Sequence, residues 1–203
     1  MVRFAREIEK IGILGGTFDP VHNAHMDLAQ AALESHSLDK VLFVPTGQPV
    51  RKLGKTFADP QHRFNMLQAV CADIEGFEVS PLEIMRPEIT YSVDTLRELR
   101  TLYGEESKLF LILGEDTATD LPTWKDAHEI AQLVVVLYAK RPGSGTDREL
   151  PQEFTCIELP MDAQELSSSL VRSMLFAGKD VQDLIPPQAL SYIREQRLYG
   201  QSL

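Results

Sequence analysis

One stretch near the start of the chain decides the fold: residues 11–25, which read IGILGGTFDPVHNAH. It opens with a short apolar run, as expected for a strand buried on both faces of a parallel sheet. Gly15 and Gly16 follow at once, and residues without a Cβ let the backbone approach a ligand closely. The residues after them begin a predicted helix, whose free N–H groups and positive dipole end favour a bound phosphate. The stretch therefore predicts a strand, a glycine turn and a helix start that form an anion site.

The rest of the chain repeats this alternation of short apolar runs and amphipathic stretches. Further strands are predicted at residues 41–44, 109–113 and 133–137. Capping residues, prolines and glycines predict helices at 60–71, at 91–102, from Ser167 to Gly178, and after Pro187. Such alternation implies right-handed crossovers and an α/β fold with a doubly wound parallel sheet. We expect one domain over residues 1–203, with a small helical part from about 166 to 203.

The composition argues against several classes of protein. Hydrophobic residues make up 43% of the chain and charged residues 25%, which is typical of a globular domain. The formal net charge of −10 argues against a nucleic-acid partner, although a few local cations can still attract a small anion. We find no apolar run long enough to span a membrane and no apolar core of a secretion signal near the start. We therefore expect a cytoplasmic protein with Cys71 and Cys156 reduced.

Two histidines stand where the first predicted helix begins. His22 and His25 are three residues apart, so they share one face of the first helical turn. Two imidazoles there can donate hydrogen bonds to a phosphate and offset the charge that builds on it. Two alternatives stay open: a glycine turn beside ordinary surface histidines, or a metal site that adds Asp19 to the two imidazoles. The helix terminus favours phosphate over a metal.

A positively charged loop follows the second predicted strand. Residues 46–56 contain three cations, Lys52 among them, and no acidic residue. Beside the first helix terminus such a loop can cover a triphosphate, although many charge clusters are only solvated loops. A P-loop is excluded, because Pro49 stands where that motif requires a glycine. A dehydrogenase is disfavoured as well, since the second strand ends at Pro45 rather than at an acidic residue.

Polar and aromatic residues also follow the later elements. Ser92 opens a predicted helix, where capping alone would explain it. Asp116 follows the strand at 109–113, and a carboxylate there can accept hydrogen bonds from ribose hydroxyls. Trp124, the only tryptophan of the chain, can stack on an aromatic base or simply pack in the core. Arg172 lies one turn inside the helix that Ser167 opens, and a cation at that positive end requires a nearby anion.

These segments, in this order, resemble the nucleotidylyltransferase superfamily. Residues 15–25 are similar to the signature around its HxGH motif, with Ala24 in place of glycine. Residues 47–52 are similar to its GxPPHK stretch, and residues 166–172 to its ISSTxxR motif. Three further segments resemble the nicotinate-nucleotide adenylyltransferase branch, which carries Y-[ST]-x-D-T, G-x-D and L-P-x-W: residues 91–95, 114–116 and 121–124.

The resemblance implies a Rossmann-like fold and a reaction. ATP and nicotinate mononucleotide would give deamido-NAD and pyrophosphate. The sequence shows no dedicated carboxylate cage, so we expect Mg²⁺ to travel with ATP and pyrophosphate and predict no metal-binding residues. The resemblance implies catalytic contacts to the phosphates from His22, His25, Lys52 and Arg172. It implies ATP binding by Gly15, Gly16, Thr17, Phe18, Ser168 and Ser169. Ser92 would hold the nicotinate carboxylate, Asp116 a ribose, and Trp124 the nicotinate ring.

Two alternatives to this function stay open. Pantetheine-phosphate adenylyltransferases and cytidylyltransferases share the first and last motifs but lack the turn at residues 121–124. A nucleotide-binding regulator without catalysis is the second alternative, and the presence of both histidines, Lys52 and Arg172 argues against it. We expect no nucleic-acid or membrane partner, and the sequence leaves the oligomeric state open.

Overall fold

The computed structural model describes residues 8–49, 58–140, 149–162 and 164–200. Its centre is a six-stranded sheet in the order β4-β2-β1-β6-β7-β8, in which every neighbouring pair is parallel. The strands are β1 (Lys10–Gly16), β2 (Lys40–Pro45), β4 (Phe77–Val79), β6 (Lys108–Gly114), β7 (Val134–Lys140) and β8 (Cys156–Asp162). The chain winds from β1 toward β4 and then crosses to β6 on the other side of β1, which confirms the doubly wound prediction. In such sheets ligands bind where the winding reverses, here between β1 and β6.

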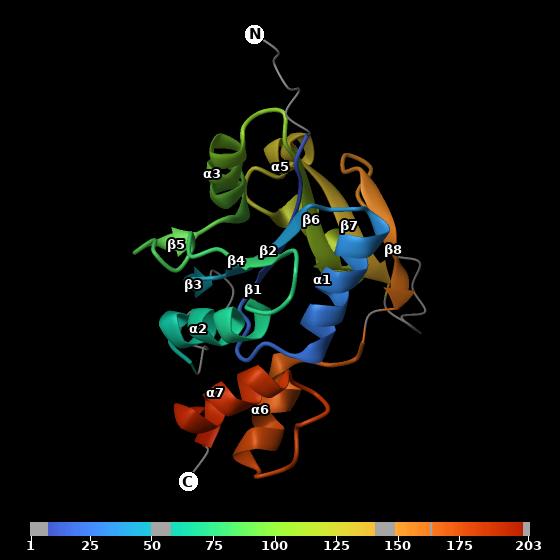
Figure 1. Cartoon of the computed structure of the whole chain (residues 1–203). Helices are drawn as coiled ribbons and strands as arrows, with labels where there is room; N and C mark the ends of the chain where they lie inside the picture. The colour runs from blue at the N-terminus through green and yellow to red at the C-terminus, as the bar shows by residue number, and fades with distance from the viewer. Residues whose placement is uncertain (1–7, 50–57, 141–148, 163, 201–203) are drawn as a thin grey trace.

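Helices cover both faces of this sheet (Figure 1). Successive side chains of a strand point to opposite faces of the sheet, because the strand is pleated. In β1, Leu14 packs into one apolar core with α1 (Asn23–Ser35) and α2 (Pro60–Cys71). Ile11 and Ile13 pack into a second core with α3 (Ser92–Tyr103) and α5 (Ala127–Leu133). Strand residues buried on both faces explain the nearly continuous apolar runs in the sequence.

The helix ends follow the signals in the sequence. Pro60 is the first residue of α2, where its missing N–H costs nothing. Gly104 ends α3 with a φ of 86°, and Gly178 adopts a φ of 64° two residues after α6 (Ser168–Phe176). The Ser167 hydroxyl caps α6 by accepting a hydrogen bond from Leu170 N at 3.2 Å. These predicted boundaries hold to within one or two residues.

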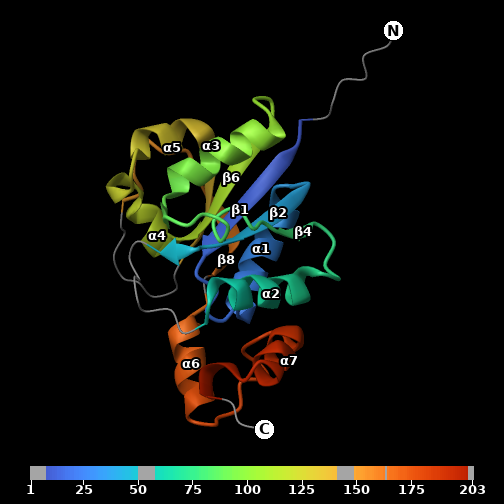
Figure 2. The ribbon, with the colours of Figure 1, turned by 90° about the vertical axis from the view of Figure 1, so that its left-hand side faces the viewer.

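The C-terminal helices lie below the sheet, where α7 packs against α2 (Figure 2). They comprise α6, α7 (Pro187–Glu195) and the 3-10 turn η3 (Leu198–Gly200). Asn23 ties them to α1, since its backbone N–H donates to Leu184 O at 2.9 Å and its side chain to Asp183 O at 2.9 Å. Apolar residues of α6 and α7 join the core that also contains Leu14. The end of the chain is therefore brought to the first helix terminus.

Several short elements lie near the same end of the sheet. β3 (Gln48–Pro49) and β5 (Ile89–Thr90) form a second, two-stranded parallel sheet. After β6 come α4 (Glu115–Thr119) and the 3-10 turn η2 (Leu121–Thr123), which leads to Trp124. Within the described ranges, none of the helices is long and apolar enough to cross a membrane.

Candidate active site

The turn between β1 and α1 forms one wall of the site. Gly15 lines a cavity, and a Cβ added there would meet no atom within 4 Å. Gly16 has a different constraint, because a Cβ on it would lie 3.0 Å from the Phe18 ring. Phe18 adopts a φ of 50° and is buried at 1% exposure, and Asp19 after it is also buried. The turn thus leaves open space beside Gly15, while Gly16 is tightly packed against the Phe18 ring.

The two histidines stack on one another at the start of α1. Their ring centroids lie 3.7 Å apart with an interplanar angle of 24°, and His22 N donates to His25 Nδ1 at 3.2 Å. The Phe18 ring meets the His25 ring edge-on at 4.9 Å. Packing from both sides therefore fixes the orientation of the His25 ring.

His22 is the more buried of the two. It is 5% exposed, and burial lowers its pKa to about 4, so the imidazole is neutral near pH 7. Its Nδ1 atom is buried and finds no hydrogen-bond partner among the described residues. A neutral ring can donate a hydrogen bond to a phosphate, but it brings no charge of its own. A neutral His22 would therefore act on a phosphate through a hydrogen bond rather than through a charge.

α6 brings its serines and arginine to the same turn. Arg172 donates from Nη1 to Asp19 O at 2.6 Å and from Nη2 to Ser169 Oγ at 3.1 Å. Ser168 Oγ donates to Pro20 O at 2.9 Å. Residues about 150 positions apart in the sequence thus meet at one helix start, beside the two histidines.

The anion that Arg172 requires is partly supplied by the protein itself. Asp19 Oδ2 lies 3.9 Å from Arg172 Nη1, and the side chain of Asp19 is 3% exposed. The Asp19 carboxylate also accepts hydrogen bonds from Ala58 N at 3.1 Å and from the Tyr199 hydroxyl at 2.7 Å. Among the residues that the structure describes, no three His, Cys, Asp or Glu side chains are grouped so that they could hold a metal ion.

Arg63 stabilises the β1–α1 turn through hydrogen bonds to backbone carbonyls. Arg63 was not predicted to be part of the site, yet it is fully buried and its guanidinium donates to three backbone carbonyls. These are Thr17 O at 2.7 Å, Gly47 O at 3.1 Å and Ala58 O at 3.3 Å. Burial lowers its pKa, and the Asp19 carboxylate opposes that shift. One α2 side chain therefore links the glycine turn to both flanks of residues 50–57.

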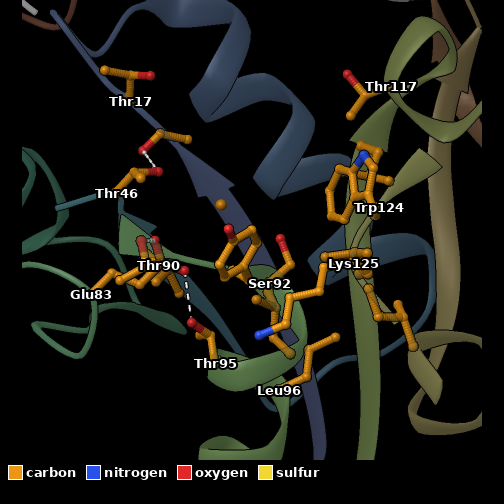
Figure 3. Close-up of a pocket in the computed structure, with 18 of the residues that line it drawn as sticks. Thr17, Thr46, Glu83, Thr90, Ser92, Thr95, Leu96, Thr117, Trp124 and Lys125 are labelled. Carbon is orange, nitrogen blue, oxygen red and sulfur yellow. Dashed lines mark hydrogen bonds between the residues drawn. The ribbon is translucent and has the colours of Figure 1, made fainter. Parts of the chain in front are cut away.

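A cavity of about 430 Å³ extends from this turn to Trp124 (Figure 3). Thr17 and Thr46 line one end, while Ser92, Trp124 and Lys125 line the other. Thr117 lines it as well, whereas its neighbour Asp116, which we expected to hold a ribose, is not part of the cavity lining. The cavity lies at the carboxyl ends of β1 and β6, where the winding of the sheet reverses.

A buried carboxylate organises the wall around Ser92. Glu83, which is 8% exposed, accepts hydrogen bonds from Thr90 Oγ1 at 3.1 Å and from Thr95 Oγ1 at 2.8 Å. Arg86 Nη1 donates to the same Thr95 oxygen at 2.9 Å. Burial raises the pKa of Glu83. Glu83 was not predicted as a site residue, because nothing in its local sequence marks it as a partner of residues on either side of Ser92.

An ion-pair cluster flanks the tryptophan. Lys125 Nζ lies 4.4 Å from the centroid of the Tyr91 ring and 3.4 Å from Asp94 Oδ2. Asp94 also accepts a hydrogen bond from Arg97 Nη1 at 2.9 Å. These contacts connect the start of α3 to the segment that carries Trp124, so they hold the two walls of this end of the cavity together.

One predicted catalytic residue lies outside the described part of the chain. Lys52 falls within residues 50–57, between the two flanks that Arg63 joins. The structure brings His22, His25, Ser168, Ser169 and Arg172 together at the β1–α1 turn, which carries Gly15 to Phe18. It places Ser92 and Trp124 in the adjoining cavity. The predicted residues therefore form two neighbouring groups, with Asp116 outside the cavity lining.

The chain is similar to known proteins over most of its length. Residues 13–174 match the family model described as cytidylyltransferase-like. A protein of Dehalococcoides mccartyi (strain CBDB1) is 40% identical over 197 residues, covering 94% of this chain and 97% of its own. A protein of Thermoanaerobacter sp. (strain X514) is 34% identical, covering 94% of each chain. Both bear the name "Probable nicotinate-nucleotide adenylyltransferase".

Solved structures confirm the fold. Plasmodium falciparum nicotinic acid mononucleotide adenylyltransferase complexed with NaAD superposes with a TM-score of 0.79 at 22% identity, covering 94% of this chain and 97% of that one. The same protein complexed with APC gives a TM-score of 0.77. The matched family model spans most of the sheet and reaches into α6, and the relatives span nearly the whole chain. The chain belongs to the cytidylyltransferase-like family, in its nicotinate-nucleotide adenylyltransferase branch.

Proposed function

We propose that this protein transfers the adenylyl group of ATP to nicotinate mononucleotide, giving deamido-NAD and pyrophosphate. The 5′-phosphate oxygen of the mononucleotide forms a new bond to the α-phosphorus of ATP. The bond from that phosphorus to the bridging oxygen breaks, and pyrophosphate leaves with its electron pair. Because the nucleophile is already an anion, the reaction needs no general base. The rate acceleration then comes from positioning the two substrates and from stabilising the charge on the phosphates in the transition state.

The β1–α1 turn and α6 form the proposed binding site of the ATP triphosphate. N–H groups at the start of α1 and the positive dipole end favour an anion there. His22 and His25 would donate hydrogen bonds, and Arg172 would supply charge opposite them. Lys52 is proposed as a further phosphate contact on the strength of its motif. Arg172 is already held in place by Asp19 O and Ser169 Oγ, so it loses little side-chain entropy when the phosphate binds.

The adjoining cavity is the proposed binding site of nicotinate mononucleotide. Trp124 offers a ring face for the nicotinate, and Ser92 offers a hydroxyl and helix-start N–H groups for its carboxylate. Lys125 lies on the same side and adds a positive charge. Asp116, directly before the cavity-lining Thr117, remains the proposed contact to a ribose on the strength of its motif. Hydrogen-bond donors at this point, without an exposed hydrogen-bond acceptor beside them, would favour the carboxylate of nicotinate over the amide of nicotinamide.

Mg²⁺ is proposed to arrive with ATP and to leave with pyrophosphate. The side chains at the described phosphate site are imidazoles, hydroxyls and a guanidinium, none of which is a preferred Mg²⁺ ligand. The nearby Asp19 carboxylate is buried and already accepts two hydrogen bonds. The phosphates and water would therefore supply the metal ligands. We further propose that residues 1–203 act as one cytoplasmic domain without a nucleic-acid partner, consistent with the acidic composition.

The observation that carries the proposal is the meeting of His22, His25 and Arg172 at one helix start, next to a cavity that contains Trp124. The test incubates the protein with ATP, Mg²⁺ and either nicotinate or nicotinamide mononucleotide, and measures pyrophosphate. We expect rapid release with the acid and at least about tenfold slower release with the amide, equivalent to about 1.4 kcal/mol. Equal rates would contradict the acid selectivity, and no release with either mononucleotide would contradict adenylyl transfer.

A paired variant tests the site itself. His25→Ala should lower turnover by about 100- to 1,000-fold, as expected when one transition-state donor is lost, and its circular dichroism should stay unchanged. His128→Ala is the matched control, because that histidine is exposed and bonds only to Gln132 in the described contacts. Wild-type turnover in the His25 variant would end its proposed role.

A further inference from the structure

Glu83 places a buried carboxylate in the wall of the cavity that contains Trp124. It lies between β4 and β5, is 8% exposed, and lines the cavity together with Thr90 and Thr95 (Figure 3). A buried carboxylate is costly unless hydrogen bonds satisfy it. Thr90 Oγ1 donates to Glu83 Oε2 at 3.1 Å, and Thr95 Oγ1 donates to Oε1 at 2.8 Å. The carboxylate is therefore bonded to one residue on each side of Ser92.

Arg86 fixes the direction of one of these hydrogen bonds. A guanidinium has donors only, so Thr95 Oγ1 accepts from Arg86 Nη1, at 2.9 Å. The single proton of the Thr95 hydroxyl then goes to Glu83 Oε1. Arg86 is held in turn by an ion pair with Glu98, on the next turn of α3. The network therefore requires a hydrogen-bond acceptor at position 83, which a carboxylate provides.

The backbone of Glu83 is anchored against the loop after β2. A Cβ added to Gly47 would lie 2.3 Å from Glu83 O, so the two backbones are in close contact. Gly47 O in turn accepts from Arg63 Nη2 at 3.1 Å. Thr90 is anchored as well, because it pairs with Pro49 between β3 and β5. Glu83 thus connects the end of β2 to the start of α3.

The start of α3 depends on support from outside the helix. Its N-cap residue is Tyr91, whose side chain makes no capping hydrogen bond within the described residues. The first N–H groups of a helix have no acceptor inside the helix, so they can bind an anion. Ser92, the first residue of α3, lines the cavity. The two threonines bonded to Glu83 stand on either side of these donors.

We propose that Glu83 is a positioning residue that sets the preference for the acid substrate: its carboxylate holds the threonines on both sides of Ser92, so that the donors at the start of α3 face the carboxylate of nicotinate. This inference rests on the proposed function. Glu83 acts through the helix start and not by touching the substrate. Without its carboxylate, the donors lose their fixed orientation. Nicotinate mononucleotide then loses more than nicotinamide mononucleotide, because hydrogen bonds to a charged group are the stronger ones.

The experiment uses Glu83→Met, which keeps the length of the side chain and removes both acceptor oxygens. It measures KM for ATP, and kcat/KM for nicotinate and for nicotinamide mononucleotide. We expect the acid-to-amide ratio of kcat/KM to fall about tenfold, or about 1.4 kcal/mol, with KM for ATP within about twofold of wild type. A parallel loss with both mononucleotides, or no loss with either, would overturn the positioning role.

Two further variants control for charge and for general loosening of α3. Glu98→Met makes the same substitution in the outer part of the network, at a side chain that is 48% exposed and outside the cavity lining. It should leave the acid-to-amide ratio within about twofold, and a tenfold fall there would overturn the role of Glu83. Glu83→Gln keeps an acceptor for Thr95, and its NH₂ group can donate to Thr90, so the ratio should stay within about threefold. A loss as large as in Glu83→Met would assign the effect to charge and refute positioning.

A smaller change decides the case even where Glu83→Met does not fold. Thr90→Val keeps the shape of the side chain without its hydroxyl, whereas Thr90→Ser keeps the hydroxyl. We expect the acid-to-amide ratio to fall about fivefold in Thr90→Val and less than about twofold in Thr90→Ser. Equal ratios in these two variants would overturn the inference. A wild type that releases no pyrophosphate from ATP and nicotinate mononucleotide contradicts the proposed function, whereas an active wild type with an unchanged ratio in Glu83→Met refutes only the role of Glu83.

Discussion

Replacing His22 with glutamine should remove an acid-sensitive contribution to the stability of the folded protein. His22 is 5% exposed, and burial lowers its pKa from 6.5 to about 4. Between these two pH values, the unfolded chain binds a proton that the folded chain excludes. The contribution is therefore fully present above pH 6.5 and is lost as the pH falls through about 4.

The size of the effect follows from the two pKa values of His22. Each pKa unit corresponds to about 1.4 kcal/mol, so the full contribution is about 3 kcal/mol, of which about 2 kcal/mol is lost between pH 7 and pH 5. Other groups also titrate in this range, but they are the same in the wild type and the variant. The difference between the two proteins in this pH dependence isolates His22.

The assay is urea unfolding at pH 7 and pH 5, followed by circular dichroism. The free energy of unfolding of the wild type should fall by about 2 kcal/mol more than that of His22→Gln over this interval. His128→Gln, which changes an exposed histidine, should show the pH dependence of the wild type. The same pH dependence in the wild type and in His22→Gln would show that His22 is not held neutral by burial, and would refute the reasoning.

Three further predictions concern the support, the cavity and the core. Arg63→Met should lower the free energy of unfolding by about 3–5 kcal/mol, because three carbonyls lose their donor, two of them in buried hydrogen bonds; a loss below about 1 kcal/mol in urea unfolding would contradict this. Trp124→Ala should raise KM for nicotinate mononucleotide about tenfold and leave KM for ATP within about twofold, and steady-state kinetics showing the reverse pattern would argue against stacking. Cys71 is 4% exposed and burial raises its pKa to about 12, so iodoacetamide at pH 8 should leave it unmodified in the native protein; mass spectrometry that finds rapid labelling would contradict its burial.

The sequence was most informative where the pattern is local. The apolar runs at 11–14, 41–44 and 109–113 all lie within strands, because burial on both faces requires continuous apolar residues. The run at 133–137 differs only in that Leu133 ends α5 and the strand begins at Val134. Proline and glycine signals set the helix ends for the same local reason.

Long-range contacts were beyond the sequence. Asp19 and Tyr199 are 180 positions apart, and no periodicity indicates that a carboxylate and a hydroxyl will meet. Glu83 was missed because its partners, Thr90 and Thr95, are joined to it only by the folded loop. Arg63 lies in a predicted helix, but which carbonyls it binds depends on how α2 packs against the turn.

Precise orientation was the other limit of prediction. A helix start can be located from sequence to within a residue or two, which is too coarse to decide which neighbour faces a cavity. Asp116 and Thr117 illustrate this, since the second of them lines the cavity. The charge state of His22 likewise depends on its burial, which the motif does not encode.

The central claim is that one triphosphate binds between the two histidines and Arg172. A crystal structure with a non-hydrolysable ATP analogue tests it most directly. We predict phosphate oxygens within hydrogen-bonding distance of His22, His25 and Arg172, with the cavity around Trp124 still open for the mononucleotide. A triphosphate bound elsewhere, or bound with either imidazole or the guanidinium facing away from it, would contradict the account.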